Sequence, residues 1–540
     1  MTNSETIYVD IIIPVHNAAA TIKDTVCSAL NQELPNHASK SSDELGRHLH
    51  ALDDIIIDIA VCCHDDGSTD DSFKILQDMK RSMEEKKYDE DQSPRITFLI
   101  SQTTDGKAYG AGAARNRAVS LRKINKGIMD NNHFLCLLDS DDIMHNHRVA
   151  EQVSVMLNLP KNEMHQTLLG SNFNRIPAES TWHYTHWANN LTDERLMLER
   201  FREVTILQPT WMLTRKRFDL LGGYIEASTN ISIEESVTTE ERTRDVKKAS
   251  VYKLIHPEHD TKQTLRLAED LRFFYAHLRY PKKVPGQEDE DESCTPSGMS
   301  GKLKLHRTKE PLVTYRHRAG QSQSSSTPRR LLLQLRAKAL EDTILRCEKS
   351  WMYDQERREG GFVIWGAGRD GKDFFKSLSP EIRAHVRCFV DVDEKKIKNG
   401  YYVSPVSTNK EKCRIPILHF SLLVSSDTLR KEMTESWING DTSSKHDEIS
   451  GKISKKRPRS IDSGVEKTII TNVTKKEKHK TGQRLLHNIG RKDVDNLALL
   501  DKLKELPVVV CVAMYRTNGV LERNVKNIGR VEGINLWHFS

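Results

Sequence analysis

The sequence lacks any long hydrophobic run, since none approaches the roughly 20 apolar residues that a membrane-spanning helix needs. The first residues, Met1 to Glu5, have neither the basic start nor the apolar stretch of a secretory signal peptide. Nine cysteines occur without regular spacing, which gives no indication of a disulfide framework. Cys62 and Cys63 lie in an apolar run, as buried thiols do. We therefore expect a reducing, cytoplasmic location.

Hydrophobic residues are also scarce, at 37%, whereas charged residues reach 29%. This balance predicts exposed insertions that dilute ordinary globular cores. A chain of 540 residues is long enough for more than one domain. The formal net charge of +6 is only a weak indication of a polyanionic partner. We find no internal repeat with a fixed period.

Strands alternate with helices over the first 150 residues, which predicts a mostly parallel sheet in a Rossmann-like α/β domain. The first helix should carry Ile22, Val26 and Leu30 on one face. The next should open with capping residues near Asp70. The expected strands are Val9–Val15, Ile55–Cys63, Ile96–Ile100 and Phe134–Leu138, and the third helix is expected at Ala113–Ile124.

The whole chain is expected to have three parts, a catalytic α/β domain, a helical linker and a smaller Rossmann-like α/β domain. The catalytic domain should carry two polar insertions, and the smaller domain a disordered basic one. The expected bounds are 1–325 (insertions at about 227–262 and 285–300), 326–359, and 360–540 (insertion at about 425–501).

Three carboxylates follow the apolar run 133–138, in Asp139-Ser140-Asp141-Asp142. Because unpaired carboxylates are costly to bury, we expect them to face solvent or a cation. The carboxyl ends of strands are where open α/β sheets bind ligands. Clustered carboxylates suit Mg²⁺ or Mn²⁺, often with substrate phosphates as further ligands. The cluster therefore indicates chemistry on a nucleotide diphosphate.

Two other polar loops should open on the same rim, Pro14-Val15-His16-Asn17 after the first strand and Asp65-Asp66-Gly67-Ser68 after the second. One can hold a base or ribose, and the other can accept from a base N–H. Taken alone, Asp-Asp-Gly-Ser is more typical of a turn with a helix cap, and an isolated Asp-Xaa-Asp is usually solvated. Three such loops in order, each at the end of a strand, are stronger evidence for a ligand site than any one of them.

Together with Ala114-Arg115-Asn116, these phrases resemble the family 2 glycosyltransferases of the GT-A fold. The resemblance implies that Pro14, His16 and Asn17 help to hold the donor and that Asp65 or Asp66 faces the uracil. It also implies that Arg115 approaches the diphosphate, although an arginine on the helix surface is an equal alternative.

The resemblance further implies a divalent metal, Mn²⁺ or Mg²⁺. Asp139 would bind ribose, and Asp141, the favoured ligand, would hold the metal together with Asp142. His317, in Tyr315-Arg316-His317, occurs where some members place a third metal ligand. A lone histidine is more often structural.

Leu267-Ala268-Glu269-Asp270-Leu271 resembles the Glu-Asp motif of the same family at the start of a helix. An inverting transferase needs a base that takes the proton of the acceptor hydroxyl, and a carboxylate can do this. Asp270 is our candidate. The alternative is an ordinary helix-start carboxylate stabilised by the helix dipole.

A second set of motifs is spread along the chain, namely Tyr184-Thr185-His186-Trp187, Leu191-Thr192, Pro209-Thr210-Trp211, Glu269-Asp270, Val390–Ile397, Arg414–Phe420 and Leu536–Ser540. Together these motifs resemble the eukaryotic queuosine-tRNA galactosyltransferases, also described as N-acetylglucosaminyltransferase-like. This resemblance implies transfer of galactose from UDP-galactose to queuosine in the anticodon of tRNA-Tyr.

The third part of the chain contains Gly366-Ala367-Gly368-Arg369-Asp370-Gly371 directly after a strand, with Asp391 and Asp393 at the end of the next. This is the context of a dinucleotide fingerprint. Glycines of this kind also serve only a tight turn and close helix packing, so we favour a structural or RNA-contacting domain. The basic runs at Lys455 and Lys475 are usually solvated charge, and a nuclear localisation signal or a tRNA contact is the alternative.

Other functions stay open. A UDP-N-acetylglucosamine or other UDP-sugar transferase acting on a glycan, protein or lipid is one. A nonenzymatic RNA-binding protein with a decayed site is another, although the intact acids argue against decay. A dinucleotide-dependent oxidoreductase is more remote.

Overall fold

The protein is described by a computed structural model that covers residues 5–34, 55–86, 96–123, 132–226, 264–279, 304–317, 327–347, 349–354, 360–404, 414–424, 502–512 and 519–539. The polar insertions and the basic runs at Lys455 and Lys475 lie outside these residues. The chain forms two compact units. Unit 1 comprises Met1–Lys349, Lys372–Ala384 and Glu532–Ser540, and unit 2 comprises Ser350–Gly371 and His385–Val531.

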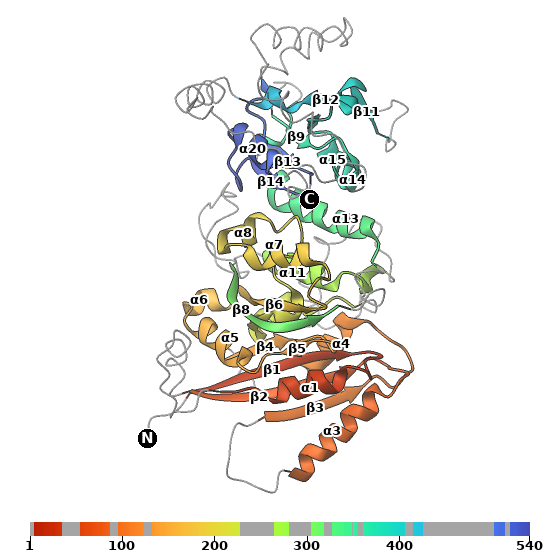
Figure 1. The fold of residues 1–540 in the computed structure, drawn as a ribbon, viewed down its shortest axis with the longest axis vertical. Helices are drawn as coiled ribbons and strands as arrows, with labels where there is room; N and C mark the ends of the chain where they lie inside the picture. Colours follow the sequence, from red (N-terminus) through yellow and green to blue (C-terminus); the bar gives the residue numbers. More distant parts are fainter. Residues whose placement is uncertain are drawn as a thin grey trace, which may run out of the picture. The chain divides into compact units, whose positions relative to one another are not determined.

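Unit 1 contains an eight-stranded sheet in the order β3-β2-β1-β4-β7-β6-β8-β5 (Figure 1). As predicted, β1 to β4 are parallel neighbours. The rest is mixed, because β7 runs antiparallel to β4 and β6 while β6 and β8 are parallel. The strands are β1 (Glu5–Val15), β2 (Ile55–Asp65), β3 (Ile96–Gln102), β4 (His133–Leu137), β5 (Ile143–Met144), β6 (Thr167–Ile176), β7 (Met212–Thr214) and β8 (Lys304–Arg316).

Helices alternate with the parallel strands and continue after them. Those of unit 1 include α1 (Ile22–Leu30), α3 (Ser72–Lys86), α4 (Ala111–Val119), α5 (Arg148–Leu157), α6 (Lys161–Met164), α7 (Trp182–Asn190), α8 (Asp193–Leu198), α9 (Arg215–Leu221), α11 (Glu269–Arg279) and α13 (Arg329–Leu340). Two short 3₁₀ helices are η2 (Gln208–Thr210) and η3 (Thr264–Arg266), and η4 (Glu341–Leu345) is a π-helix that follows α13. Lys349–Trp351 forms η5 across the unit boundary.

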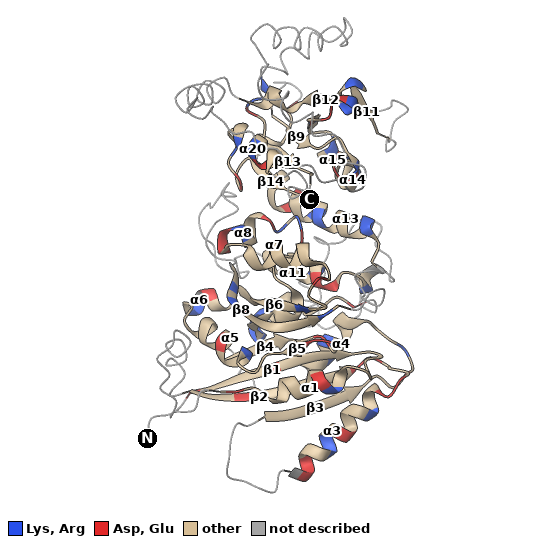
Figure 2. Cartoon of the chain, viewed as in Figure 1, with Lys and Arg blue, Asp and Glu red and all other residues tan. Residues whose placement is uncertain are grey.

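The first strand and the first helix of unit 1 pack into its hydrophobic core. The inner part of β1 is buried on both faces, as in central parallel strands. α1 buries Ile22, Val26 and Ala29, whereas Leu30 is only partly buried, so the predicted stripe is correct except at its end. The Asp70 carboxylate accepts from the backbone N–H of Ser72 at 3.0 Å and so caps α3, as predicted. Figure 2 shows charges of both signs along α3.

Unit 2 contains a second, smaller α/β sheet, in which the strands run in the order β11-β12-β10-β9-β13. β9 pairs in parallel with β10 and β13, and β10 in parallel with β12. The elements after η5 are β9 (Phe362–Trp365), α14 (Arg369–Ser377), α15 (Pro380–Arg383), β10 (Val386–Asp391), α16 (Glu394–Lys398), β11 (Tyr401–Val403), β12 (Arg414–His419), η6 (Phe420–Leu423), β13 (Val508–Val510), α20 (Val520–Asn527) and β14 (Leu536–His538). Most of α14, with α15 and β14, groups with unit 1.

Two expectations from composition can be compared with the described residues. Within them, no helix combines the length and apolar character needed to cross a membrane. Cys62 and Cys63 are fully buried thiols, as predicted.

Candidate active site

The three loops predicted to share a rim are joined by hydrogen bonds. The backbone N–H of Asn17, after β1, donates to Ser68 Oγ at 2.9 Å, and its side-chain Oδ1 accepts from the Thr69 N–H at 2.9 Å. The hydroxyls of Thr21 and Thr25 both donate to the carbonyl of Ser140, each at 3.0 Å. The loops after β1, β2 and β4 therefore form one continuous edge of the sheet.

The first loop places its expected donor-binding residues in different surroundings. Pro14 is buried within β1, so it shapes the strand end from inside. His16 and Asn17 are exposed at the rim, and His16 Nδ1 lies 3.0 Å from the carbonyl oxygen of Asp66. Asn17 has a positive φ of 50°, a conformation that asparagine tolerates better than most residues.

Asp65 and Asp66 are buried at the end of β2, and each has one oxygen without a hydrogen-bond partner, Oδ2 in Asp65 and Oδ1 in Asp66. Oδ1 of Asp65 accepts from the backbone N–H of Ser68 at 2.9 Å. Oδ2 of Asp66 accepts from the backbone N–H groups of Tyr109 at 2.7 Å and Gly110 at 2.6 Å. Burial raises the pKa of Asp66. Asp66 Oδ1 also lies 3.7 Å from an Arg117 guanidinium nitrogen, in an ion pair. Neither oxygen accepts a hydrogen bond within the protein, so both are suited to accept N–H donors from a ligand.

Arg115 connects the strand-end acids with α11. Its guanidinium donates to Asp139 Oδ1 at 2.6 Å and to Glu269 Oε1 at 2.9 Å. The side chain is only 3% exposed, so it is not an arginine on the helix surface. The Tyr224 ring centre lies 5.4 Å from it. Arg115 therefore holds the two acidic segments together.

The acids after β4 differ from one another. Asp139 and Asp141 are half-buried, but Asp142 is fully buried, although we expected all of the acids to face solvent or a cation. The burial of Asp142 is supported by the backbone N–H of Arg316, which donates to its Oδ1 at 2.9 Å. Burial, then the charges of Asp139 and Asp141, raise its pKa well above the usual range. Its Oδ2 has no hydrogen-bond partner.

This cluster fits a cation chemically, because mutually repelling carboxylates with an unpartnered buried oxygen are relieved by a positive ion. Within the described part of the chain, however, no group of three His, Cys, Asp or Glu side chains is placed to hold a metal. Asp141, Asp142 and His317 are therefore not gathered into a preformed ligand set. His317 is half-buried, and its backbone N–H donates to the Ile176 carbonyl at 2.8 Å.

Asp270 lies in the first turn of α11, beside Glu269. Burial, and next the charge of Glu269, raise the pKa of Asp270 to about 7. The preceding residue, Ala268, has a positive φ of 55°, a strained conformation for alanine of the kind that is concentrated at functional sites. A carboxylate with a pKa near neutrality has the properties of a general base.

Some residues that shift the pKa of side chains in this site were not predicted from the sequence. The carboxylate of Glu203 adds to the rise in the pKa of Asp270, and no local motif marks it. Arg175, on β6, lies 4.4 Å from the ring centre of Tyr315, and the charge of Asp142 acts on both side chains. These interactions depend on the completed fold, so a single sequence holds no signal for them.

Comparison with a protein-family model indicates the kind of enzyme to which the N-terminal part of the chain is similar. Residues 10–220 match the family model described as Glycosyl transferase family 2. Over these residues the chain is similar to the family 2 glycosyltransferases, and the protein is a sugar transferase.

Solved structures of low similarity were also found. Residues 1–349 of S. aureus TarS in complex with UDP-GlcNAc align at 12% identity and a TM-score of 0.36, covering 76% of this chain and 99% of that one. A mannosyltransferase from Pyrobaculum calidifontis, in complex with GDP-Man and Mn²⁺, aligns at 12% identity and a TM-score of 0.33, covering 63% of this chain and 65% of that one.

Proposed function

We propose that this sugar transferase moves galactose from UDP-galactose to queuosine in the anticodon of tRNA-Tyr, with inversion and with a divalent metal. The observation that carries the transferase chemistry is Asp270, whose pKa is raised to about 7 beside the acids that Arg115 ties together. The queuosine acceptor is supported by the sequence resemblance alone.

In the proposed reaction Asp270 takes the proton from a hydroxyl of the queuosine cyclopentenediol as that oxygen attacks the anomeric carbon. The bond from this carbon to the diphosphate oxygen breaks on the opposite face, so UDP leaves and the configuration inverts. Because the Asp270 pKa lies near neutrality, the carboxylate is largely ionised at slightly alkaline pH and still basic enough to accept a proton.

The donor would lie on the rim formed by the first two loops. Asp65 Oδ2 and Asp66 Oδ1, which accept no hydrogen bond within the protein, are candidates for the uracil N–H, with His16 and Asn17 exposed beside them. Asp139 would meet the ribose through its oxygen that does not bind Arg115. Since both arms of Arg115 are engaged, we assign it to holding Asp139 and Glu269 in place rather than to direct contact with the diphosphate.

The metal, Mn²⁺ or Mg²⁺, would be held by Asp141 and Asp142, and by His317 if its ring turns toward them. When bound, it would offset the negative charge of the departing diphosphate. The unpartnered Oδ2 of Asp142 supports this assignment.

The proposal is tested by incubating the full-length protein and Mn²⁺ with radiolabelled UDP-galactose or UDP-N-acetylglucosamine. The acceptors are tRNA-Tyr with queuosine and the same tRNA carrying guanosine at that position. We expect label only from UDP-galactose and only on the queuosine-containing tRNA. Transfer of N-acetylglucosamine would contradict the donor, and equal labelling of both tRNAs would contradict the acceptor. Label on neither, with transfer to a glycan, lipid or protein, would establish the alternative acceptor class.

We also propose a cytoplasmic location, which the buried thiols Cys62 and Cys63 support. A nuclear pool would depend on the basic run at Lys455.

A further inference from the structure

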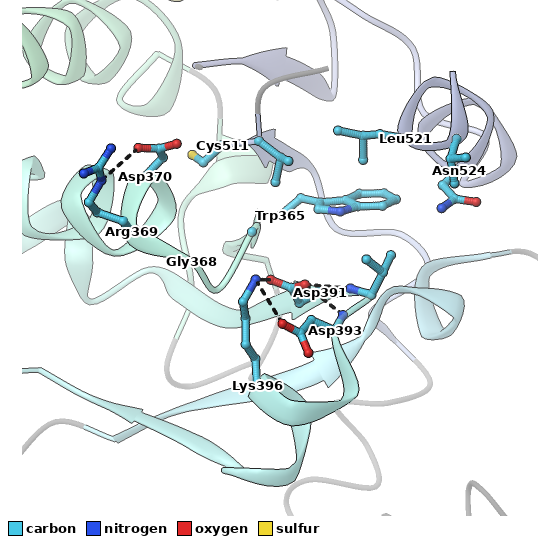
Figure 3. A pocket seen from close by; sticks show the side chains of 14 residues that line it. Trp365, Gly368, Arg369, Asp370, Asp391, Asp393, Lys396, Cys511, Leu521 and Asn524 are labelled. Carbon is cyan, nitrogen blue, oxygen red and sulfur yellow. Dashed lines mark hydrogen bonds and ion pairs between the residues drawn. The ribbon is translucent and has the colours of Figure 1, made fainter. Parts of the chain in front are cut away.

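Unit 2 has a cavity of about 260 Å³ at the carboxyl end of β9, and the proposed transferase chemistry does not use it. Figure 3 shows Trp365 and Leu521 along one side, Asp391, Asp393 and Lys396 on the other, and Gly368 between them. All of the residues that line it belong to unit 2.

The three glycines of Gly366–Gly371 differ in whether the surrounding structure leaves room for a side chain. A Cβ on Gly366 would lie 2.7 Å from Val512 Cγ2, and one on Gly371 would lie 1.8 Å from the Gly366 carbonyl oxygen, so both are required by close packing. A Cβ on Gly368 would meet only Lys396 Nζ, at 3.7 Å, an ordinary contact. Packing therefore explains Gly366 and Gly371, whereas Gly368 leaves open space over the loop.

Polar and apolar groups both line this space, and the polar ones include Asp370 and Asn524. Lys396 Nζ lies 3.0 Å from Asp391 Oδ2 and 3.8 Å from Asp393 Oδ2, and an ammonium group has three donors. The start of α14 adds backbone N–H groups that lack a carbonyl partner in their own helix, together with the largely exposed Arg369. Val392 and Val520, 50% and 45% exposed, also line the cavity.

Asp391 limits what this cavity can accept. Its Oδ1 accepts from the N–H groups of Val392 and Asp393 at 2.9 and 3.0 Å, and its Oδ2 from the Ala367 N–H at 2.8 Å and from Lys396. A carboxylate has about four acceptor positions, and all four are occupied. Asp391 is thus not available for the ribose diol of NAD. The volume of about 260 Å³ also lies near the lower end of the roughly 300–1,000 Å³ usual for small-ligand pockets, which favours a ligand smaller than a dinucleotide.

We propose that this cavity binds a nucleoside monophosphate. The phosphate would lie over Gly368, against the first turn of α14, with Arg369 and the remaining donor of Lys396. The ribose would face Asp393, and the base would lie against Val392 and Val520. This site is separate from the transferase rim and does not depend on the identity of the sugar acceptor.

Equilibrium dialysis of the full-length protein with radiolabelled AMP or UMP tests the proposal, with NAD⁺ and inorganic phosphate as competitors. Gly368→Glu places a side chain and a negative charge in the cavity without a backbone clash, and Lys396→Ala removes the ammonium group. Lys398→Ala, on the same helix, is the matched control, because Lys398 is 77% exposed and does not line the cavity.

We expect AMP, UMP or both to bind, with affinity lowered about tenfold or more by Gly368→Glu, less by Lys396→Ala and not by Lys398→Ala. Sugar-transfer activity and the thermal midpoint of the Gly368→Glu protein should match those of the wild type. Inorganic phosphate and NAD⁺ should compete poorly. Failure of both nucleotides to bind at millimolar concentration, binding unchanged by Gly368→Glu, or tighter binding of NAD⁺ would overturn the proposal.

Discussion

Asp270 is half-buried beside a second carboxylate, and this position gives it a proton affinity suited to base catalysis. Below pH 7 the Asp270 carboxyl group is protonated in most molecules and cannot accept a proton. We therefore expect kcat/KM for sugar transfer to fall about tenfold per pH unit below pH 7 and to level off above it. A pH–rate profile with saturating metal measures this directly.

Replacing Glu203 provides a sharper test of the same carboxyl group. Its charge raises the Asp270 pKa, so Glu203→Gln should lower that pKa and move the acidic limb of the profile to lower pH. Glu85→Gln, an exposed glutamate on α3, is the control and should leave the limb unchanged. If the acidic limb of the profile does not move in Glu203→Gln, that limb reports the ionisation of a group other than Asp270.

Arg115 is predicted to matter for stability as well as for activity. Arg115→Met leaves Asp139 and Glu269 without their shared partner, and removing one member of a buried ion pair costs about 3 kcal/mol or more. Arg81→Met removes a 70% exposed arginine paired with Asp78 and should change stability by less than about 1 kcal/mol. Urea unfolding of the two variants makes the comparison. Equal losses would show that Arg115 has no special structural role.

At the scale of elements, the loop after β2 must approach the loop before α4 closely. Gly67 has a φ of +72°, and a Cβ there would lie 2.9 Å from the Lys107 carbonyl oxygen. Gly106 has a φ of +71° with nothing within 4 Å of its Cβ position. Alanine at either position brings a similar backbone strain, about 1–2 kcal/mol, but only Gly67→Ala also brings a clash.

We therefore expect Gly67→Ala to weaken UDP binding about tenfold, the equivalent of 1.4 kcal/mol, by moving the loop that carries Asp65 and Asp66. Gly106→Ala should leave UDP binding near that of the wild type. Isothermal titration of UDP into both variants measures the difference. Equal affinities would mean that this loop does not set the donor site.

The parallel strands could be predicted because they contain continuous apolar runs that end in polar loops. The mixed half of the sheet could not, because β5 has two residues and β7 three, too few to show any period. The third helix was expected at Ala113–Ile124 but spans Ala111–Val119, since glycine and alanine at its start carry little pattern.

In the candidate site, too, some features could be predicted from the sequence and others could not. The acids after β2 and β4 follow from local sequence, and the hydrogen bonds between their loops are consistent with the predicted rim. The pairing of Arg115 with Glu269 joins residues 154 apart, and that of Asp142 with the Arg316 N–H joins residues 174 apart. Such partners depend on the completed fold, so the burial of Asp142 could not be foreseen.

At the scale of the whole molecule, the proposed metal predicts dependence on a divalent cation. Treatment with EDTA should abolish sugar transfer, and Mn²⁺ or Mg²⁺ should restore it. Asp142→Asn should raise the metal concentration needed for half-maximal rate, since it alters a carboxylate whose Oδ2 has no partner in the protein. Full activity in the presence of EDTA would contradict a metal-dependent reaction.

The most direct test of the account is the Asp270→Asn protein, assayed for galactose transfer to queuosine-containing tRNA-Tyr and for UDP-galactose affinity. Asparagine keeps the shape but cannot take a proton. We predict a loss of the transfer rate of about 100-fold or more, within the usual contribution of a general base, with donor affinity nearly unchanged. Wild-type turnover by Asp270→Asn would contradict the assignment of Asp270 as the base.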